Sequence, residues 1–205
     1  MKYHTKYDHI LKELEKVLHN GFSSYRVFED WLDLMLFALI GEEEKYLEVV
    51  RKYPNKGEIG NREIDYFANA FGLLMQAMKE TNDEILGELY MQWNMSNKYK
   101  GQFFTPKYIA AMMAKMVNPR GKILEPCCGA GIMLVEAIKA MSKDDISQSV
   151  FYVQDIDLTC VKMCSLNLTF FNVNGFVIWG NTIKMEVKKV YQTLRTYLRG
   201  AIREI

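Results

Sequence analysis

The chain has 205 residues and a formal net charge of +1, and its composition excludes several classes of protein. Its length favours one domain, or a compact domain with an appendage. Apolar residues make up 49% and charged residues 25%, as is typical of a globular protein with a substantial core. The nearly neutral charge gives no sign of nucleic-acid binding in the composition as a whole. We find neither a secretion signal nor an apolar run of membrane-spanning length, so we expect a cytoplasmic protein with no membrane contact.

Residues 1–100 are predicted to form a helical N-terminal region. Apolar residues recur at helical spacing in two stretches, 10–18 and 64–78. Between them, VFEDWLDLMLFALI (27–40) is too short and too acidic to cross a membrane and should be the buried helix of this region. The segment KYPNKGEIGN (52–61) is rich in Gly, Pro and Asn and predicts a loop.

From residue 101 the pattern changes to alternating strands and helices. The segment GQFFTPKYIAAMMAKMV (101–117) predicts a helix with Thr105 as its N-cap and Pro106 at its first position. Three apolar runs then predict strands, and helical runs at 131–141 and 158–171 separate them. The predicted strands are KILEP (122–126), SVFYVQDID (149–157) and GFVIWGN (175–181). This order predicts an α/β fold with a parallel sheet and flanking helices, the first half of a Rossmann-like fold.

The segment EPCCGAGIM (125–133) joins the first predicted strand to its helix and contains two glycines one residue apart. Ligands of such sheets bind at the carboxyl ends of the strands. Gly129 and Gly131 would let backbone N–H groups approach a ligand at a helix N-terminus. Asp155 ends the next strand, where a carboxylate can accept hydrogen bonds from ribose hydroxyls. The third glycine of a dinucleotide motif is absent, since Leu134 and Val135 occupy that neighbourhood, so a nucleoside without a pyrophosphate is favoured.

Four segments occur in the order of the first motifs of adenine-N6 DNA methyltransferases. They are GQFFTP, LEPCCGAGIML, YVQDIDLTCVKMCSLNL and VIWGNT. The chain most resembles the modification subunits of type I restriction systems and related phage and plasmid proteins, over residues 85–185. The resemblance implies a partial class I methyltransferase sheet, preceded by a helical region, and S-adenosylmethionine as the cofactor.

The resemblance also implies contacts to the methionine end of that cofactor. By matching position, Phe104, Thr105 and Glu125 would make these contacts, together with the loop from Gly129 to Gly131. The departures from the family pattern in this loop are the two adjacent cysteines, which stand where the family has small residues.

The nucleoside end of the cofactor would meet three further residues. Asp155 would accept hydrogen bonds from the ribose hydroxyls, and Ile156 would pack on the adenine. Asn181 stands where the family usually has an aspartate that reads the adenine amino group, and an amide oxygen can still accept there. The implied cofactor-binding residues are Phe104, Thr105, Glu125, Pro126, Cys127, Gly129, Gly131, Asp155, Ile156 and Asn181.

The four cysteines raise the alternatives of a metal site, a redox pair or simple packing. Cys127 and Cys128 are neighbours, and a strained disulfide between them is not expected in a reducing compartment. Cys160 and Cys164 lie one helical turn apart, which suits a metal pair, but all three histidines lie in the first 20 residues. We therefore expect packing and no metal site.

The catalytic motif of the family is missing from this sequence. That motif follows a fourth strand and consists of a polar residue, two prolines and an aromatic residue, which hold the flipped adenine. None of the four prolines adjoins another, and none follows residue 126. We therefore assign no catalytic residue.

Two hypotheses about function follow. In the first, the chain is an S-adenosylmethionine-binding DNA modification protein that is inactive alone, its catalytic strand being lost by truncation or supplied by a partner. In the second, it is a non-catalytic structural or interaction module. A small-molecule methyltransferase fits less well, because GQFFTP points by resemblance to the nucleic-acid group.

The family topology implies that the KILEP strand has an open edge, because its fourth strand is missing. We expect the chain's own tail, a protein partner or a second copy of the chain to cover that edge. Residues 184–205 predict a basic amphipathic C-terminal helix, since apolar residues recur at steps of three and four and the net charge is +4. Its cations would form a flank exposed to solvent or a stripe facing DNA phosphates. The predicted organisation is thus a helical N-terminal region (1–100), an S-adenosylmethionine-binding methyltransferase-like half-domain (101–183) and a basic C-terminal helix (184–205).

Overall fold

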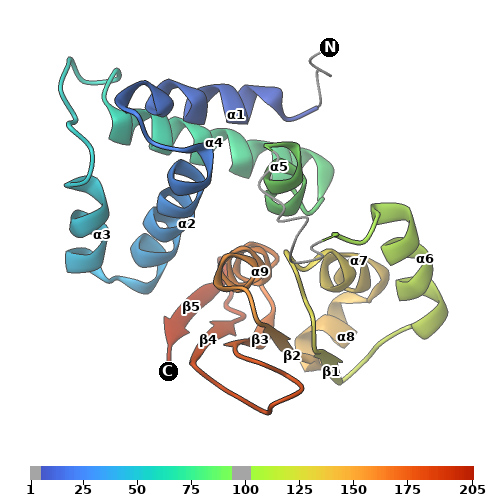
Figure 1. The fold of residues 1–205 in the computed structure, drawn as a ribbon. Helices are drawn as coiled ribbons and strands as arrows, with labels where there is room; N and C mark the ends of the chain where they lie inside the picture. Colours follow the sequence, from blue (N-terminus) through green and yellow to red (C-terminus); the bar gives the residue numbers. More distant parts are fainter. Residues whose placement is uncertain (1–5, 94–102) are drawn as a thin grey trace. The chain divides into compact units, whose positions relative to one another are not determined.

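The computed structural model describes residues 6–93 and 103–205, and the chain divides into two compact units, residues 1–97 and 98–205 (Figure 1). Each unit has its own set of buried apolar side chains. Within the described residues, no helix has both the length and the apolar composition needed to cross a membrane.

The first unit is helical, as predicted. Its elements are α1 (Asp8–Glu15), the 3-10 helix η1 (Lys16–Asn20), α2 (Ser24–Ile40), α3 (Glu43–Val50), α4 (Glu63–Thr81) and α5 (Leu86–Gln92). The predicted buried helix is α2, where Phe28 and Trp31 are almost fully buried. The indole N–H of Trp31 donates to the main-chain oxygen of Phe67 in α4 at 3.2 Å. Ser23 caps the start of α2, and Gly41 ends it in a left-handed conformation.

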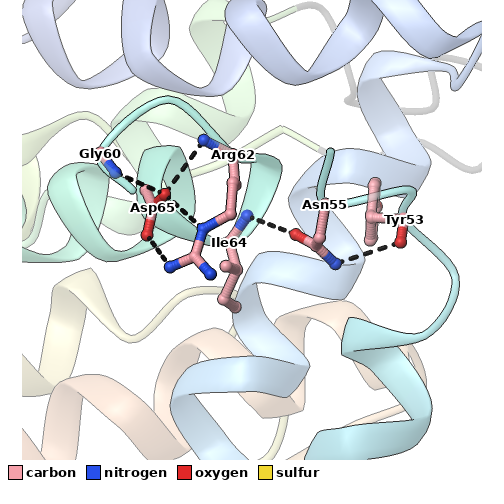
Figure 2. Close-up of polar contacts among 6 residues, drawn as sticks. All are labelled: Tyr53, Asn55, Gly60, Arg62, Ile64 and Asp65. Carbon is pink, nitrogen blue, oxygen red and sulfur yellow. Dashed lines mark hydrogen bonds and ion pairs between the residues drawn. The ribbon is translucent and has the colours of Figure 1, made fainter. Parts of the chain in front are cut away.

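The predicted loop between α3 and α4 is tied to the first turn of α4 (Figure 2). One carboxylate oxygen of Asp65 accepts from the backbone N–H groups of Gly60 at 2.8 Å and Arg62 at 3.0 Å. The Arg62 guanidinium bonds to the same carboxylate and holds its pKa well below the usual range. The side-chain oxygen of Asn55 accepts from the N–H of Ile64 at 3.0 Å. This loop is therefore an ordered cap on α4.

The second unit is an α/β sheet structure, which confirms the predicted fold class. Its elements are α6 (Lys107–Val117), β1 (Lys122–Glu125), α7 (Ile132–Ala140), α8 (Lys143–Gln148), β2 (Val150–Asp155), α9 (Leu158–Phe170), β3 (Asn174–Trp179), β4 (Lys189–Leu194) and β5 (Ala201–Glu204). The strand order is β1-β2-β3-β4-β5. The first three strands are parallel, as predicted, and β4 and β5 extend the sheet in antiparallel fashion.

The two faces of the sheet differ in burial. Helix α9 packs across β2 to β5, and Phe151, Val153 and Val177 on that face are fully buried (Figure 1). The opposite face carries Tyr152 and Phe176, whose rings stack with centroids 5.4 Å apart and remain partly exposed. The sheet therefore has one covered face and one that is partly open.

The prediction of a C-terminal helix over residues 184–205 is wrong. These residues contain the hairpin of β4 and β5, which adds to the free side of β3. Alternate residues Tyr191 and Thr193 are buried, and this two-residue period is that of a strand. β-branched and aromatic residues also favour strands over helices. The tail therefore does not cover the edge of β1, contrary to one of the expectations from the sequence.

Candidate cofactor site

The glycine loop follows β1 and lies at the carboxyl ends of the parallel strands. Gly129 and Gly131 have φ angles of +52° and +97°, which side-chain-bearing residues rarely adopt. The N–H of Gly131 donates to the main-chain oxygen of Cys128 at 2.9 Å, and the N–H of Cys128 donates to that of Gln154 at 3.0 Å. These bonds turn the chain from β1 into α7 and fasten the turn to β2.

Close packing around the two glycines explains why larger residues do not fit there. A Cβ atom on Gly129 would lie 3.3 Å from the ring of Phe104. A Cβ atom on Gly131 would lie 3.2 Å from Sγ of Cys164 in α9. The side-chain amide of Asn167 in α9 also donates to the main-chain oxygen of Ala130 at 2.8 Å. The loop is therefore held between Phe104 on one side and α9 on the other.

Asp155, the last residue of β2, links the loop to the start of α9. One carboxylate oxygen accepts from the N–H of Gly129 at 2.9 Å, and the other accepts from the N–H of Asp157 at 2.9 Å. Burial raises the pKa of this carboxyl, while the backbone N–H groups of Asp157 and Gly129 oppose the rise. Each ionised oxygen has a further lone pair, so the carboxylate can still accept from a ligand.

The segment before α6 supplies the aromatic wall of the site. Phe104 is half-buried against Gly129, and Phe103 is exposed. Thr105 is half-buried, but it is not the N-cap of α6. The helix begins at Lys107, and Pro106 is its N-cap with an extended ψ of 137°, so the predicted cap is wrong by one residue.

The first turn of the loop is built from Glu125, Pro126 and Cys127. The side chain of Glu125 accepts from the N–H of Cys127 at 3.1 Å. The side chain of Cys127 is exposed, and the main-chain oxygen of Pro126 accepts from the hydroxyl of Thr182 at 2.8 Å. Thr182 was not among the predicted site residues, although it belongs to the VIWGNT segment that carried the resemblance.

The ends of β2 and β3 bring two more of the predicted residues to this edge of the sheet. The side chain of Ile156 is 64% exposed, and its main-chain oxygen accepts from the indole of Trp179 at 3.1 Å. The side-chain oxygen of Asn181 accepts from the N–H of Lys184 at 3.0 Å and so closes the turn after β3. This edge therefore offers a loop of backbone N–H groups, a carboxylate and an exposed apolar side chain.

All four cysteines are free thiols: Cys127 and Cys128 lie in the loop, and Cys160 and Cys164 lie in α9. Cys128, Cys160 and Cys164 are buried, and Cys127 is exposed. A hydrogen bond with Cys164 and burial both raise the pKa of the Cys128 thiol, which keeps it neutral. In the part of the chain that the structure describes, no three His, Cys, Asp or Glu side chains form a group that could hold a metal ion. The close approach of the Cys164 side chain to Gly131 indicates that this thiol packs α9 against the loop.

Comparison with known proteins gives a family match over more than half of the chain. The model of the family described as N-6 DNA Methylase matches residues 80–196. This stretch contains α6, the glycine loop, Asp155 and β4.

Individual relatives are similar over shorter or longer parts of the chain. The methylase subunit of the type I restriction enzyme MjaIX from Methanocaldococcus jannaschii is 23% identical over 145 residues, which cover 65% of this chain and 26% of the relative. The methylase subunit of the type I enzyme MpnII from Mycoplasma pneumoniae is 26% identical over 121 residues, which cover 57% of this chain and 20% of the relative. The type II restriction enzyme and methyltransferase RM.BcgI from Heyndrickxia coagulans is 25% identical over 168 residues, which cover 72% and 26%. The matched stretches thus span about a quarter or less of these relatives.

Proposed function

The chain belongs to the N-6 DNA methylase family, and on that premise we propose that its glycine loop binds S-adenosylmethionine, the methyl donor for DNA modification. The methionine end would lie against the loop from Gly129 to Gly131, beside Phe104 and Thr105 and next to the turn of Glu125, Pro126 and Cys127. These groups meet at one edge of the sheet, where ligands of such folds bind.

The nucleoside end would lie at the end of β2. The carboxylate of Asp155 would accept from the ribose hydroxyls, and the exposed side chain of Ile156 would pack on the adenine. Asn181 would lie beside the adenine amino group. The 2.9 Å bond between the N–H of Gly129 and Asp155 is the main support for the proposal, because it brings the loop and the ribose-binding carboxylate within the length of one nucleoside.

When bound, S-adenosylmethionine supplies a methyl group activated by its sulfonium sulfur. Transfer to adenine also requires groups that hold the flipped base and its amino group. The sequence contains no pair of adjacent prolines and therefore lacks the family's base-binding motif. We therefore propose that the chain is inactive alone and that a partner protein supplies this motif.

The edge of β1 is the proposed place for the partner's strand. Strand β1 ends the strand order and pairs with β2 alone among the described residues. Its side chain Leu124 is 76% exposed. An added strand would pair with the free backbone groups of β1 and cover Leu124.

Formation of N6-methyladenine tests partner completion. The purified chain with labelled S-adenosylmethionine and genomic DNA should give no product. Product should form when lysate of the natural host, deleted for this chain, is added. Leu124→Asp should abolish that product, whereas Ile59→Asp, at an 86% exposed apolar side chain of the other unit, should not. Product from the purified chain alone, or equal activity of the Leu124→Asp chain, would overturn the proposal.

A further inference from the structure

The two units carry opposite charges, which the net charge of the whole chain hides. Residues 98–205 contain 15 Lys and Arg side chains and eight Asp and Glu side chains, a net charge of +7. Residues 1–97 contain 11 Lys and Arg side chains and 17 Asp and Glu side chains, a net charge of −6. The second unit is therefore basic, and a basic unit attracts polyanions.

Part of this positive charge lies in the turn between β4 and β5, residues 195–199, which we name the hairpin tip. Its backbone is fixed by two asparagines, one just before β3 and one at the start of β3. The side-chain oxygen of Asn174 accepts from the N–H of Arg195 at 2.9 Å, and that of Asn172 accepts from the N–H of Thr196 at 2.9 Å. The amide of Asn172 also donates to the main-chain oxygen of Thr196 at 2.9 Å. The tip is thus a preformed turn.

Directly after the tip, the chain packs closely against the backbone of α9. Gly200 is buried, and a Cβ atom there would lie 1.9 Å from the main-chain oxygen of Thr169. Within the tip, the hydroxyl of Thr196 accepts from the N–H of Arg199 at 3.2 Å. The side chains of the tip are consequently presented from a turn that is held at both ends.

Those side chains point into solvent. Tyr197 is 100% exposed, and Arg195 and Arg199 are exposed as well. No carboxylate pairs with either arginine in the described ranges 6–93 and 103–205. By contrast, Lys189 in β4 pairs with Glu204 in β5 at 3.0 Å. The tip therefore presents two exposed arginines, one before and one after an exposed tyrosine in the chain.

We propose that the hairpin tip binds the phosphate backbone of DNA. Arg195 and Arg199 would each contact a phosphate, which the planar guanidinium group bonds in bidentate fashion. Tyr197 would lie against a sugar or an unstacked base. DNA is favoured over an acidic protein because the +7 charge of the unit extends beyond the tip and suits a uniformly charged polyanion.

The tip lies at the opposite end of the sheet from the glycine loop. Thr193, next to the last residue of β4, pairs with Gly175 near the start of β3, whereas the loop lies at the carboxyl ends of the parallel strands. The length of β3 separates these ends by about 20 Å. The tip would thus hold DNA backbone away from the cofactor and add affinity that does not depend on base sequence. This inference rests on the proposed function, since it takes DNA as the substrate.

Fluorescence anisotropy with a labelled 25-base-pair duplex and the full chain tests the proposal. The double variant Arg195→Ala and Arg199→Ala should weaken binding about tenfold or more at low salt. It should also reduce the slope of log affinity against log salt by about 1.8, because two phosphate contacts are lost. The control is the double variant Arg120→Ala and Lys188→Ala, which also removes two positive charges. Arg120 pairs with Asp145, and Lys188 pairs with Glu186, each at 3.7 Å. This control should change the affinity less than twofold.

A second pair of variants tests the aromatic ring of Tyr197. Tyr197→Ala should weaken binding of single-stranded DNA about fivefold or more, whereas Tyr108→Ala, at an 87% exposed ring in α6, should not. Equal loss in the control variants, or no loss in the tip variants, would overturn the proposal. Displacement of the duplex by poly-glutamate at equal charge would assign the tip to an acidic protein instead. S-adenosylmethionine binding should be unchanged in the tip variants, so failure here leaves the cofactor proposal standing.

Discussion

At the scale of single residues, Asp155 has the central position in the candidate site. Its two oxygens hold the glycine loop and the start of α9, and its free lone pairs remain for a ligand. Burial raises the pKa of this carboxyl above its ordinary value of 3.8. Ribose hydroxyls donate hydrogen bonds to the ionised carboxylate. Below the raised pKa the Asp155 carboxyl is mostly protonated, so binding of the ribose is coupled to loss of that proton.

The affinity for S-adenosylmethionine should therefore fall as the pH decreases through the raised pKa of Asp155, above pH 3.8, and be constant at higher pH. Asp155→Asn should remove this dependence and weaken binding about tenfold, the expected cost of a hydrogen bond to a charged group. Calorimetry between pH 4 and 7 measures both effects. The same pH profile in the Asp155→Asn chain would show that another group titrates.

At the scale of elements, the β4–β5 hairpin depends on one close approach of backbone to backbone. Gly200→Ala would place a Cβ atom 1.9 Å from the main-chain oxygen of Thr169, so one of the two segments must move. We expect the free energy of unfolding to fall by about 1–3 kcal/mol, as for other overpacked sites. Denaturant unfolding measures this change. Gly72→Ala is the matched control, because Gly72 lies in α4 with nothing within 4 Å, and there alanine should stabilise the chain by about 0.5–1 kcal/mol.

The elements differ in how well the sequence predicted them. The strands β1, β2 and β3 follow from short apolar runs that end at Pro, Asp or Gly, and these signals are local. Helix α8 has no buried residue, so it lacks the apolar period by which helices are predicted. In the tail, Tyr191, Leu194 and Leu198 recur at helical steps, yet Leu198 is 86% exposed and pairing with β3 decided the structure. Such pairing is a tertiary interaction that overrides local periodicity.

The positions of the site residues could be predicted better than the structure of the tail, because the site residues lie at the ends of strands and helices. Gly129, Gly131 and Asp155 were proposed from the motif, and in the structure Asp155 accepts from the N–H of Gly129 while Gly131 packs against Cys164. The bond from Thr182 to Pro126 joins residues 56 positions apart and depends on the path of the turn after β3. No local pattern predicts that path. The assigned roles in cofactor binding remain predictions.

At the scale of the whole molecule, a basic sheet unit and an acidic helical unit share one chain. The sheet unit has a glycine loop at one end of its strands and an arginine-bearing tip at the other, and β1 is one of its two edge strands. In the proposed account these three places take the cofactor, the DNA backbone and a partner's strand. The hairpin tip lies at the other end of the sheet from the cofactor site and outside β1, so tip variants should leave cofactor binding and partner binding unchanged.

Calorimetric titration of S-adenosylmethionine into the full chain tests whether the glycine loop binds this cofactor. We expect binding at a one-to-one ratio, weakened at least tenfold by Gly129→Val, which would press on Phe104, and by Asp155→Ala. Ile183→Ala, at a 96% exposed side chain of the neighbouring turn, should leave the affinity unchanged. Absence of binding at millimolar ligand, or binding that neither site variant weakens, would rule out this cofactor site and favour a non-catalytic interaction module.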